Sequence, residues 1–162
     1  MAVDIFISYA QDDQDLRIQL GKHLSSLKNQ QTIREWYDGY IVPGTPRKEE
    51  ILKHLAEAQI ILLLITKDFM ASEFCYSVEM QAAIARHKAG EARVVPILLR
   101  AVDVQGAPFA DLAMLPSGGE PVSKWPDPDD AFFDIVQGIR RVIGDLLPNP
   151  PVAYRGKQAP AR

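Results

Sequence analysis

The 162 residues alternate short strand-like runs with amphipathic segments, and this order predicts a doubly wound α/β fold around a parallel sheet. A second observation supports it: the run "QIILLLIT" at residues 59–66 is apolar on both faces, as a central parallel strand requires. The length of the chain suits one domain with its own hydrophobic core.

Five segments are predicted to be strands, at residues 3–9, 32–38, 59–66, 92–100 and 121–125. The first, "VDIFISY", is a β-branched and aromatic run typical of a buried strand. The fourth contains Pro96, which has no N–H to donate, so we expect it near a sheet edge or at a bulge. The fifth, "PVSKW", is short and is also expected at an edge.

The segments between the strands carry apolar residues at helical spacing. Asp12 or Asp13 is predicted to cap a helix that runs to about Lys28, and Asp127 or Asp129 to start the last helix. Two further helices are predicted at residues 47–58 and 72–87. All three histidines fall within these helices, and we expect them on solvent-facing sides.

The composition argues against several classes of function. The net charge is −3 and the pI is about 5.6, so no broad basic face is available for nucleic acid. Cys75 is the single cysteine, so no intrachain disulfide and no Cys/His metal cluster is predicted, and a cytoplasmic location is the default. The apolar run at residues 60–65 is too short to span a membrane.

The composition changes after residue 147. The segment "PNPPVAYRGKQAPAR" contains four prolines and no apolar periodicity. We therefore expect residues 1–147 to form the folded domain and residues 148–162 to be a linker or tail that leads to a further domain outside this chain.

Three segments follow the first three strands and should meet at one edge of the sheet: "SYAQDD", "DGYIVPGTPR" and "TKDFMASEFCYSVE". Neither GxGxxG nor GxxxxGK[ST] is present, which disfavours a nicotinamide dehydrogenase or a P-loop NTPase. Asp4, Asp12 and Asp13 could form the acidic cluster of a phosphoacceptor domain, although helix capping explains the last two more simply.

The helix "SEFCYSVEMQAAIARH" carries one carboxylate in its middle. Helical spacing places Ser72, Cys75, Tyr76 and Glu79 along one stripe, while Phe74 and later apolar residues can face the sheet. On periodicity alone, Glu79 is interpreted as an exposed helix residue. Cys75 has no histidine placed to activate it and is interpreted as a small packed residue.

Four blocks in this chain resemble the Toll/interleukin-1 receptor (TIR) domain family in its bacterial branch. They are "DIFISYA", "WYDGYIVPG", "SEFCYSVEM" and "PVSKW", and they occur in the order that the family shows. The resemblance covers residues 3–147. It implies a flavodoxin-like three-layer sandwich in which helices flank a five-stranded parallel sheet.

The resemblance also implies that the domain is an NAD+ glycohydrolase. Such an enzyme cleaves the nicotinamide–ribose bond and releases nicotinamide with ADP-ribose or a cyclic isomer, and NAD+ is its substrate rather than a cofactor. Glu79 matches the family's catalytic glutamate. One carboxylate suffices, because nicotinamide leaves as a neutral molecule and only the cationic ribose needs stabilising.

The same resemblance assigns substrate-binding positions on the three converging segments. They are Phe6, Ser8, Tyr9, Ala10, Tyr37, Asp38, Tyr40, Ile41, Pro43, Gly44, Ser72, Phe74 and Cys75. Trp36 should point to the opposite side of its strand from Tyr37 and is interpreted as a core residue.

Assembly is a further implication of the resemblance. The loop at residues 39–46, from Gly39 to Pro46, is expected to dock beside Glu79 of another protomer, and such a contact repeats into filaments. We expect an effector of a bacterial immune (antiphage) system, with a sensor or oligomerisation domain after the linker. The alternatives are a non-catalytic TIR interaction scaffold and a virulence factor that mimics host TIR signalling.

Overall fold

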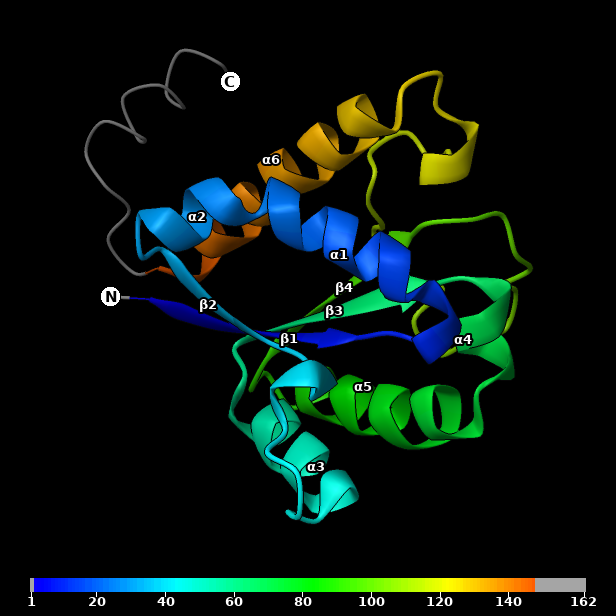
Figure 1. Cartoon of the computed structure of the whole chain (residues 1–162). Coiled ribbons are helices and arrows are strands. Elements are labelled where there is room, and N and C mark those ends of the chain that lie inside the picture. Colours follow the sequence, from blue (N-terminus) through cyan, green and yellow to red (C-terminus); the bar gives the residue numbers. More distant parts are fainter. Residues whose placement is uncertain (1, 148–162) are drawn as a thin grey trace.

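A computed structural model describes residues 2–147 of the chain. Within them, four parallel strands form one sheet in the order β2-β1-β3-β4 (Figure 1). Their bounds are β1 (Val3–Ser8), β2 (Ile33–Trp36), β3 (Ile60–Ile65) and β4 (Arg93–Leu98). All six residues of β3 are buried, which confirms the prediction that this run is a central strand.

In residues 2–147, six α-helices connect and cover the strands: α1 (Gln14–His23), α2 (Ser25–Asn29), α3 (Arg47–Glu57), α4 (Lys67–Ala71), α5 (Met80–Lys88) and α6 (Pro128–Leu146). In Figure 1, α1, α2 and α6 lie on one face of the sheet, and α3 and α5 lie on the other. Ile5 and Ile7 of β1 point into the first layer, whereas Phe6 points into the second. The three-layer α/β architecture is therefore confirmed.

The prediction of a fifth strand is wrong. Residues Val122–Lys124 of "PVSKW" form a 3-10 turn, and the N–H groups of Lys124 and Trp125 bond locally to the carbonyls of Pro121 and Val122. Pro121 has no N–H to offer to a ladder, which favours this local pattern.

Among the described residues, one isolated β-bridge extends the sheet beyond β4, at Leu115 rather than within residues 121–125. Leu115 pairs with Ile97 of β4: its N–H donates to the Pro96 carbonyl at 3.0 Å, and its carbonyl accepts from the Leu98 N–H at 2.8 Å. The sheet thus ends at β4, and the prediction that the Pro96 strand lies at an edge is confirmed.

The predicted first helix differs at its start and in its middle, whereas the end of α2 at Asn29 agrees with the predicted end near Lys28. It breaks at Leu24 into α1 and α2, and neither Asp12 nor Asp13 caps it through a side-chain hydrogen bond. Asp13 is buried instead and accepts a hydrogen bond from the Thr66 hydroxyl. The start of α6 agrees with the sequence, since the Asp127 side chain accepts from the backbone N–H of Asp129 at 2.9 Å.

None of the helices that the structure describes combines the length and the apolar character needed to cross a bilayer. The proposed linker at residues 148–162 lies outside the described residues, so its role stays a prediction.

Candidate active site

Glu79 ends a π-helical turn, Phe74–Glu79, that precedes α5, and the Met80 N–H donates to the Cys75 carbonyl five residues earlier. The wider turn is a feature that regular helical spacing does not predict, and such turns are frequent at functional sites. Only 6% of Glu79 is exposed. The interpretation of Glu79 as an exposed helix residue is therefore wrong.

The face assignment of this helix is also corrected. Cys75 and Glu79 share one stripe, as predicted, but that stripe faces the sheet together with Met80 and Ala83. Ala85, one of the later apolar residues that the spacing placed on the sheet side, is exposed.

Ser8 is the partner of the buried carboxyl. It is the last residue of β1 and is 1% exposed, and its hydroxyl donates to Glu79 Oε1 at 2.6 Å. A hydrogen bond from a hydroxyl to an ionised carboxylate is short and strong. The pair therefore joins the carboxyl end of a central strand to the helix that carries Glu79.

The surroundings of Glu79 alter its acidity. Burial raises the pKa of Glu79 from 4.5 to about 7, and the negative charge of Asp38 adds to the increase, whereas the Ser8 hydrogen bond and the Arg47 charge oppose it. The group consequently occupies both protonation states near neutral pH. A carboxyl with this pKa can switch between acid and anion under physiological conditions.

Asp38 connects three segments of the site. Its Oδ1 accepts from the Tyr9 hydroxyl at 2.6 Å, and its Oδ2 accepts from Gln11 Nε2 at 2.5 Å and from an Arg47 guanidinium nitrogen at 2.6 Å. The contacts tie the end of β1, the loop after β2 and the start of α3 together. Burial and Asp38 raise the pKa of Tyr9 to about 12, so its hydroxyl remains a donor.

Two of these Asp38 partners were not assigned to the site from the sequence. Neither Arg47 nor Gln11 is among the substrate-binding positions that the sequence predicts. Both are exposed, and their contacts with Asp38 span nine and 27 residues. Helical or strand periodicity carries no signal for such contacts.

Arg17 of α1 packs against Tyr37, which follows β2, and against Tyr9, which follows β1. The sequence analysis did not assign it to the site. It is 7% exposed, and its guanidinium carbon lies 3.7 Å from the centre of the Tyr37 ring and 5.6 Å from that of Tyr9. The Tyr37 ring in turn packs on the Tyr40 ring at 4.6 Å. The sequence did hold a signal, because Arg17 stands three residues before Leu20 on the apolar stripe of the helix.

Cys75 is a packed thiol, as the sequence indicated. Its Sγ donates to the Tyr9 carbonyl at 3.4 Å, and its backbone N–H donates to Ser72 Oγ at 3.1 Å. Burial raises the pKa of Cys75 to about 11, so the thiol stays protonated at neutral pH and is a poor nucleophile.

The remaining candidate residues separate into core and loop positions. Phe6 and Ala10 are buried in the α3/α5 layer, and Phe74 and Ile41 pack against it half-buried. Tyr40, Pro43 and Gly44 are exposed on the loop. The structure therefore brings Ser8, Tyr9, Asp38, Ser72, Cys75 and Glu79 together and leaves the loop tip outside this cluster.

The acidic cluster of a phosphoacceptor domain is not formed. Asp4 stands at the opposite end of β1 from Asp13 and pairs with Arg34 at 2.7 Å. Asp13 is engaged by Thr66.

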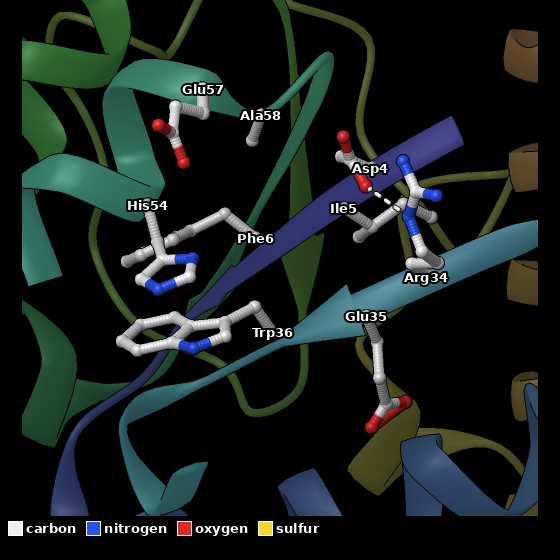
Figure 2. A pocket seen from close by; sticks show the side chains of 9 residues that line it. All are labelled: Asp4, Ile5, Phe6, Arg34, Glu35, Trp36, His54, Glu57 and Ala58. Carbon is white, nitrogen blue, oxygen red and sulfur yellow. Dashed lines mark hydrogen bonds and ion pairs between the residues drawn. The ribbon is translucent and has the colours of Figure 1, made fainter. Parts of the chain in front are cut away.

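A hollow of about 320 Å³ lies between β1, β2 and α3 (Figure 2). The residues of β1 that line it are Asp4, Ile5 and Phe6, which precede Ser8 at the end of the strand. Glu79 is not among its lining residues. Trp36 is half-buried there and stacks on His54 at 4.1 Å and on Phe6 at 5.4 Å. The interpretation of Trp36 as a core residue is thus only partly right.

The sheet, its two helical layers and the loop after β2 define a doubly wound α/β domain of the kind that the sequence blocks resemble. The family model of the TIR domain matches residues 5–125, and the chain belongs to the TIR domain family.

A relative with a curated sequence is the uncharacterized protein y4lF of Sinorhizobium fredii (strain NBRC 101917 / NGR234). The two are 42% identical over 160 residues, which cover 97% of this chain and 50% of y4lF. The chain thus spans about half the length of the curated relative it matches.

Two solved structures share the fold. The TIR domain of the Toll-related receptor TRR-2 from Hydra magnipapillata is similar with a TM-score of 0.63 and 18% identity, over 86% of this chain and 96% of that one. The TIR domains of the activated Roq1 resistosome, which directly recognizes the pathogen effector XopQ, are similar with a TM-score of 0.62 and 18% identity, over 85% of this chain and 99% of that one. Identities this low extend the comparison to the fold alone.

Proposed function

We propose that this TIR domain is an NAD+ glycohydrolase of the bacterial branch and that Glu79 is its catalytic residue. The observation that carries the proposal is the buried Glu79 carboxyl, held by Ser8 at the carboxyl end of β1. Ligands of doubly wound folds bind beside these strand ends. The raised pKa of Glu79 is typical of a functional carboxyl.

The chemistry requires the anionic form of Glu79. The bond between the nicotinamide nitrogen and ribose C1′ breaks, and its electron pair stays on the ring nitrogen, so nicotinamide leaves neutral. The positive charge that develops at C1′ and the ring oxygen is stabilised by the nearby carboxylate. Water then adds to C1′ and loses a proton, giving ADP-ribose; capture by an internal nucleophile of the ADP-ribosyl group gives a cyclic isomer.

The low exposure of Glu79 in a single protomer explains why assembly would be needed. In the single protomer the carboxyl is 6% exposed, and Asp38 fastens the neighbouring loop to Tyr9, Gln11 and Arg47. We propose that residues 39–46 dock on another protomer and open this region for NAD+. Tyr40 and Val42 are 53% and 66% exposed on that loop and supply apolar surface for docking.

Self-association is part of this proposal, and the likeness to the TIR domains of the Roq1 resistosome supports the TIR fold of the protomer alone. The head-to-tail contact proposed here would repeat into filaments.

The length of the bacterial relative, about twice that of this chain, supports one part of the wider setting that we propose, namely a further domain beside the TIR domain. The TIR domain would be the effector part of a cytoplasmic antiphage protein, joined through residues 148–162 to a sensor or oligomerisation domain. Clustering of the sensor would then trigger depletion of NAD+.

The proposal is tested by measuring nicotinamide release from NAD+ with the chain clustered on a multivalent support and with the same chain free in solution. We expect turnover only when the protein is clustered, and its loss in Glu79→Gln. Glu73→Gln is the matched control, because Glu73 is exposed on the same helical segment. Retained turnover in Glu79→Gln would refute the assignment.

A second candidate function is a non-catalytic interaction module. The exposed loop residues Tyr40 and Val42 favour it, since a scaffold needs this surface but has no need of Glu79. It predicts self-association without nicotinamide release even under clustering.

A further inference from the structure

The hollow between β1, β2 and α3 is a separate feature from the Glu79 cluster. Its volume of about 320 Å³ lies at the lower end of the range of small-molecule sites, roughly 300–1,000 Å³. A single flat ring with a polar substituent suits a space of this size. Among the residues that line it, only Phe6 was also a candidate for the NAD+ site.

One end of the hollow is aromatic. The Trp36 and His54 rings stack at 4.1 Å with an angle of 8° between their planes, and Phe6 packs on Trp36 at 5.4 Å. Figure 2 shows this stack on the same side of the hollow as Glu57. Stacked, half-buried rings of this kind offer faces and edges to a planar ligand.

The charges around the hollow favour a cation. At the end away from the rings, the Asp4 carboxylate is neutralised by Arg34 at 2.7 Å. Glu35 points away from the hollow in Figure 2 and pairs with Lys28 at 3.0 Å. Among the lining carboxylates that the structure describes, Glu57 is thus the one without an ion-pair partner, and the Glu50 carboxylate, 3.9 Å from His54 Nε2, adds negative charge beside the ring stack. An aromatic ring next to a carboxylate is a favourable site for a positive group.

We propose that this hollow is a second ligand site, which binds a small planar aromatic cation between the Trp36–His54 stack and the Glu57 carboxylate. The ring of the ligand packs against the aromatic end, and its positive group donates hydrogen bonds to Glu57. An amidinium or a similar planar cation can present two N–H groups to one carboxylate, which adds orientation to the charge attraction.

The site is tested with benzamidine as the probe, on the ¹⁵N-labelled full chain. Benzamide, which is neutral and of nearly the same shape, and benzoate, which is an anion, are the comparison ligands. The Trp36 indole N–H signal reports on the hollow, and the Trp125 indole, which donates to the Glu120 carbonyl far along the chain, is the internal reference.

We expect benzamidine to move the Trp36 signal with a Kd of about 1 mM. Benzamide should bind about five-fold more weakly or worse, and benzoate should leave the signal unchanged. Glu57→Gln should weaken benzamidine about five-fold and leave benzamide unaffected, as the loss of a partly exposed ion pair implies. Glu49→Gln, an exposed change in the first turn of α3, should bind like the wild type.

Equal binding of benzamidine and benzamide, wild-type binding by Glu57→Gln, or a Trp36 signal that does not respond would each overturn the proposal. Tighter binding of N-acetylarginine amide than of benzamidine would overturn the aromatic assignment and indicate a peptide arginine as the occupant. None of these measurements uses NAD+, so their failure is distinguishable from failure of the proposed glycohydrolase.

Discussion

Ser8 and Glu79 lie 71 residues apart in the chain, yet their side chains meet through a buried hydrogen bond of 2.6 Å. The hydroxyl stabilises the carboxylate form and lowers the pKa of Glu79, against the larger effect of burial, which raises it. This one contact couples the end of a central strand to the proposed catalytic group, and several measurable consequences arise from it.

Removing the hydroxyl should raise the pKa of Glu79 further. In Ser8→Ala, burial and the Asp38 charge act without this opposing hydrogen bond, so we expect the ¹³C NMR titration of Glu79 Cδ to have its midpoint above that of the wild type. Ser77→Ala, an exposed change on the same helical turn, should leave the midpoint in place. An unchanged or lower midpoint in Ser8→Ala would contradict the role given to Ser8.

The raised pKa of Glu79 also links folding to pH. The folded protein keeps a proton up to about pH 7 that the unfolded chain loses near 4.5, so raising the pH across this window favours unfolding. Relative to Glu79→Gln, which does not titrate, the wild type should lose about 3 kcal/mol of unfolding free energy over the window.

Urea unfolding at a series of pH values measures this difference. Glu49→Gln, at an exposed site, should track the wild type at every pH. If the free energies of unfolding of the wild type and of Glu79→Gln changed in parallel with pH, the pKa of Glu79 would be the same in the folded and unfolded protein. That result would contradict the prediction.

Asp38 is expected to control two pKa values at once. Its charge raises the pKa of both Tyr9 and Glu79, so Asp38→Asn should lower the Tyr9 value from about 12 toward 10 and the Glu79 value below about 7. NMR titration of the two side chains in one sample measures both shifts. Asp111→Asn, an exposed change in the irregular segment after β4, should shift neither, and an Asp38→Asn variant with wild-type midpoints would rule out the coupling.

The exposed loop residues should matter more for assembly than for folding. Replacing Tyr40 and Val42 by serine removes side chains that are 53% and 66% exposed, together with the Tyr37–Tyr40 ring contact, so we expect the unfolding free energy to fall by no more than about 1 kcal/mol. Self-association, measured by light scattering, and nicotinamide release should both fall at least about ten-fold if this loop docks on another protomer.

Phe133→Ser is the control for this pair, because Phe133 is equally exposed, at 64%, on α6. If that variant lost association to the same extent, general surface hydrophobicity rather than the loop would be responsible.

The sequence predicted the features that depend on local periodicity. The apolar run of β3, the amphipathic α6 with its Asp127 cap and the alternation of strands and helices are all confirmed. The prediction of a fifth strand was wrong because Pro121 has no N–H to donate to a ladder, and Val122–Lys124 form a local turn despite the strand-like composition of "PVSKW". Composition alone does not reveal which of the two will win.

The sequence predicted the residues of the site better than it predicted the contacts between them. Glu79, Ser8 and Asp38 were all candidates, but periodicity placed Glu79 in solvent because a π-helical turn leaves no mark on spacing. The Asp38 contacts with Gln11 and Arg47 depend on how a loop closes, which long-range packing decides. The buried Arg17 under Tyr37 could have been noticed as a cation on an apolar helix stripe.

The most direct test is the pH dependence of nicotinamide release by the clustered chain, measured from pH 5.5 to 8.5 for the wild type and Glu79→Gln. If the Glu79 anion stabilises the developing ribose cation, the wild-type rate rises with a midpoint near pH 7, and the variant is inactive throughout. Comparable rates in the wild type and in Glu79→Gln across this range would contradict the account.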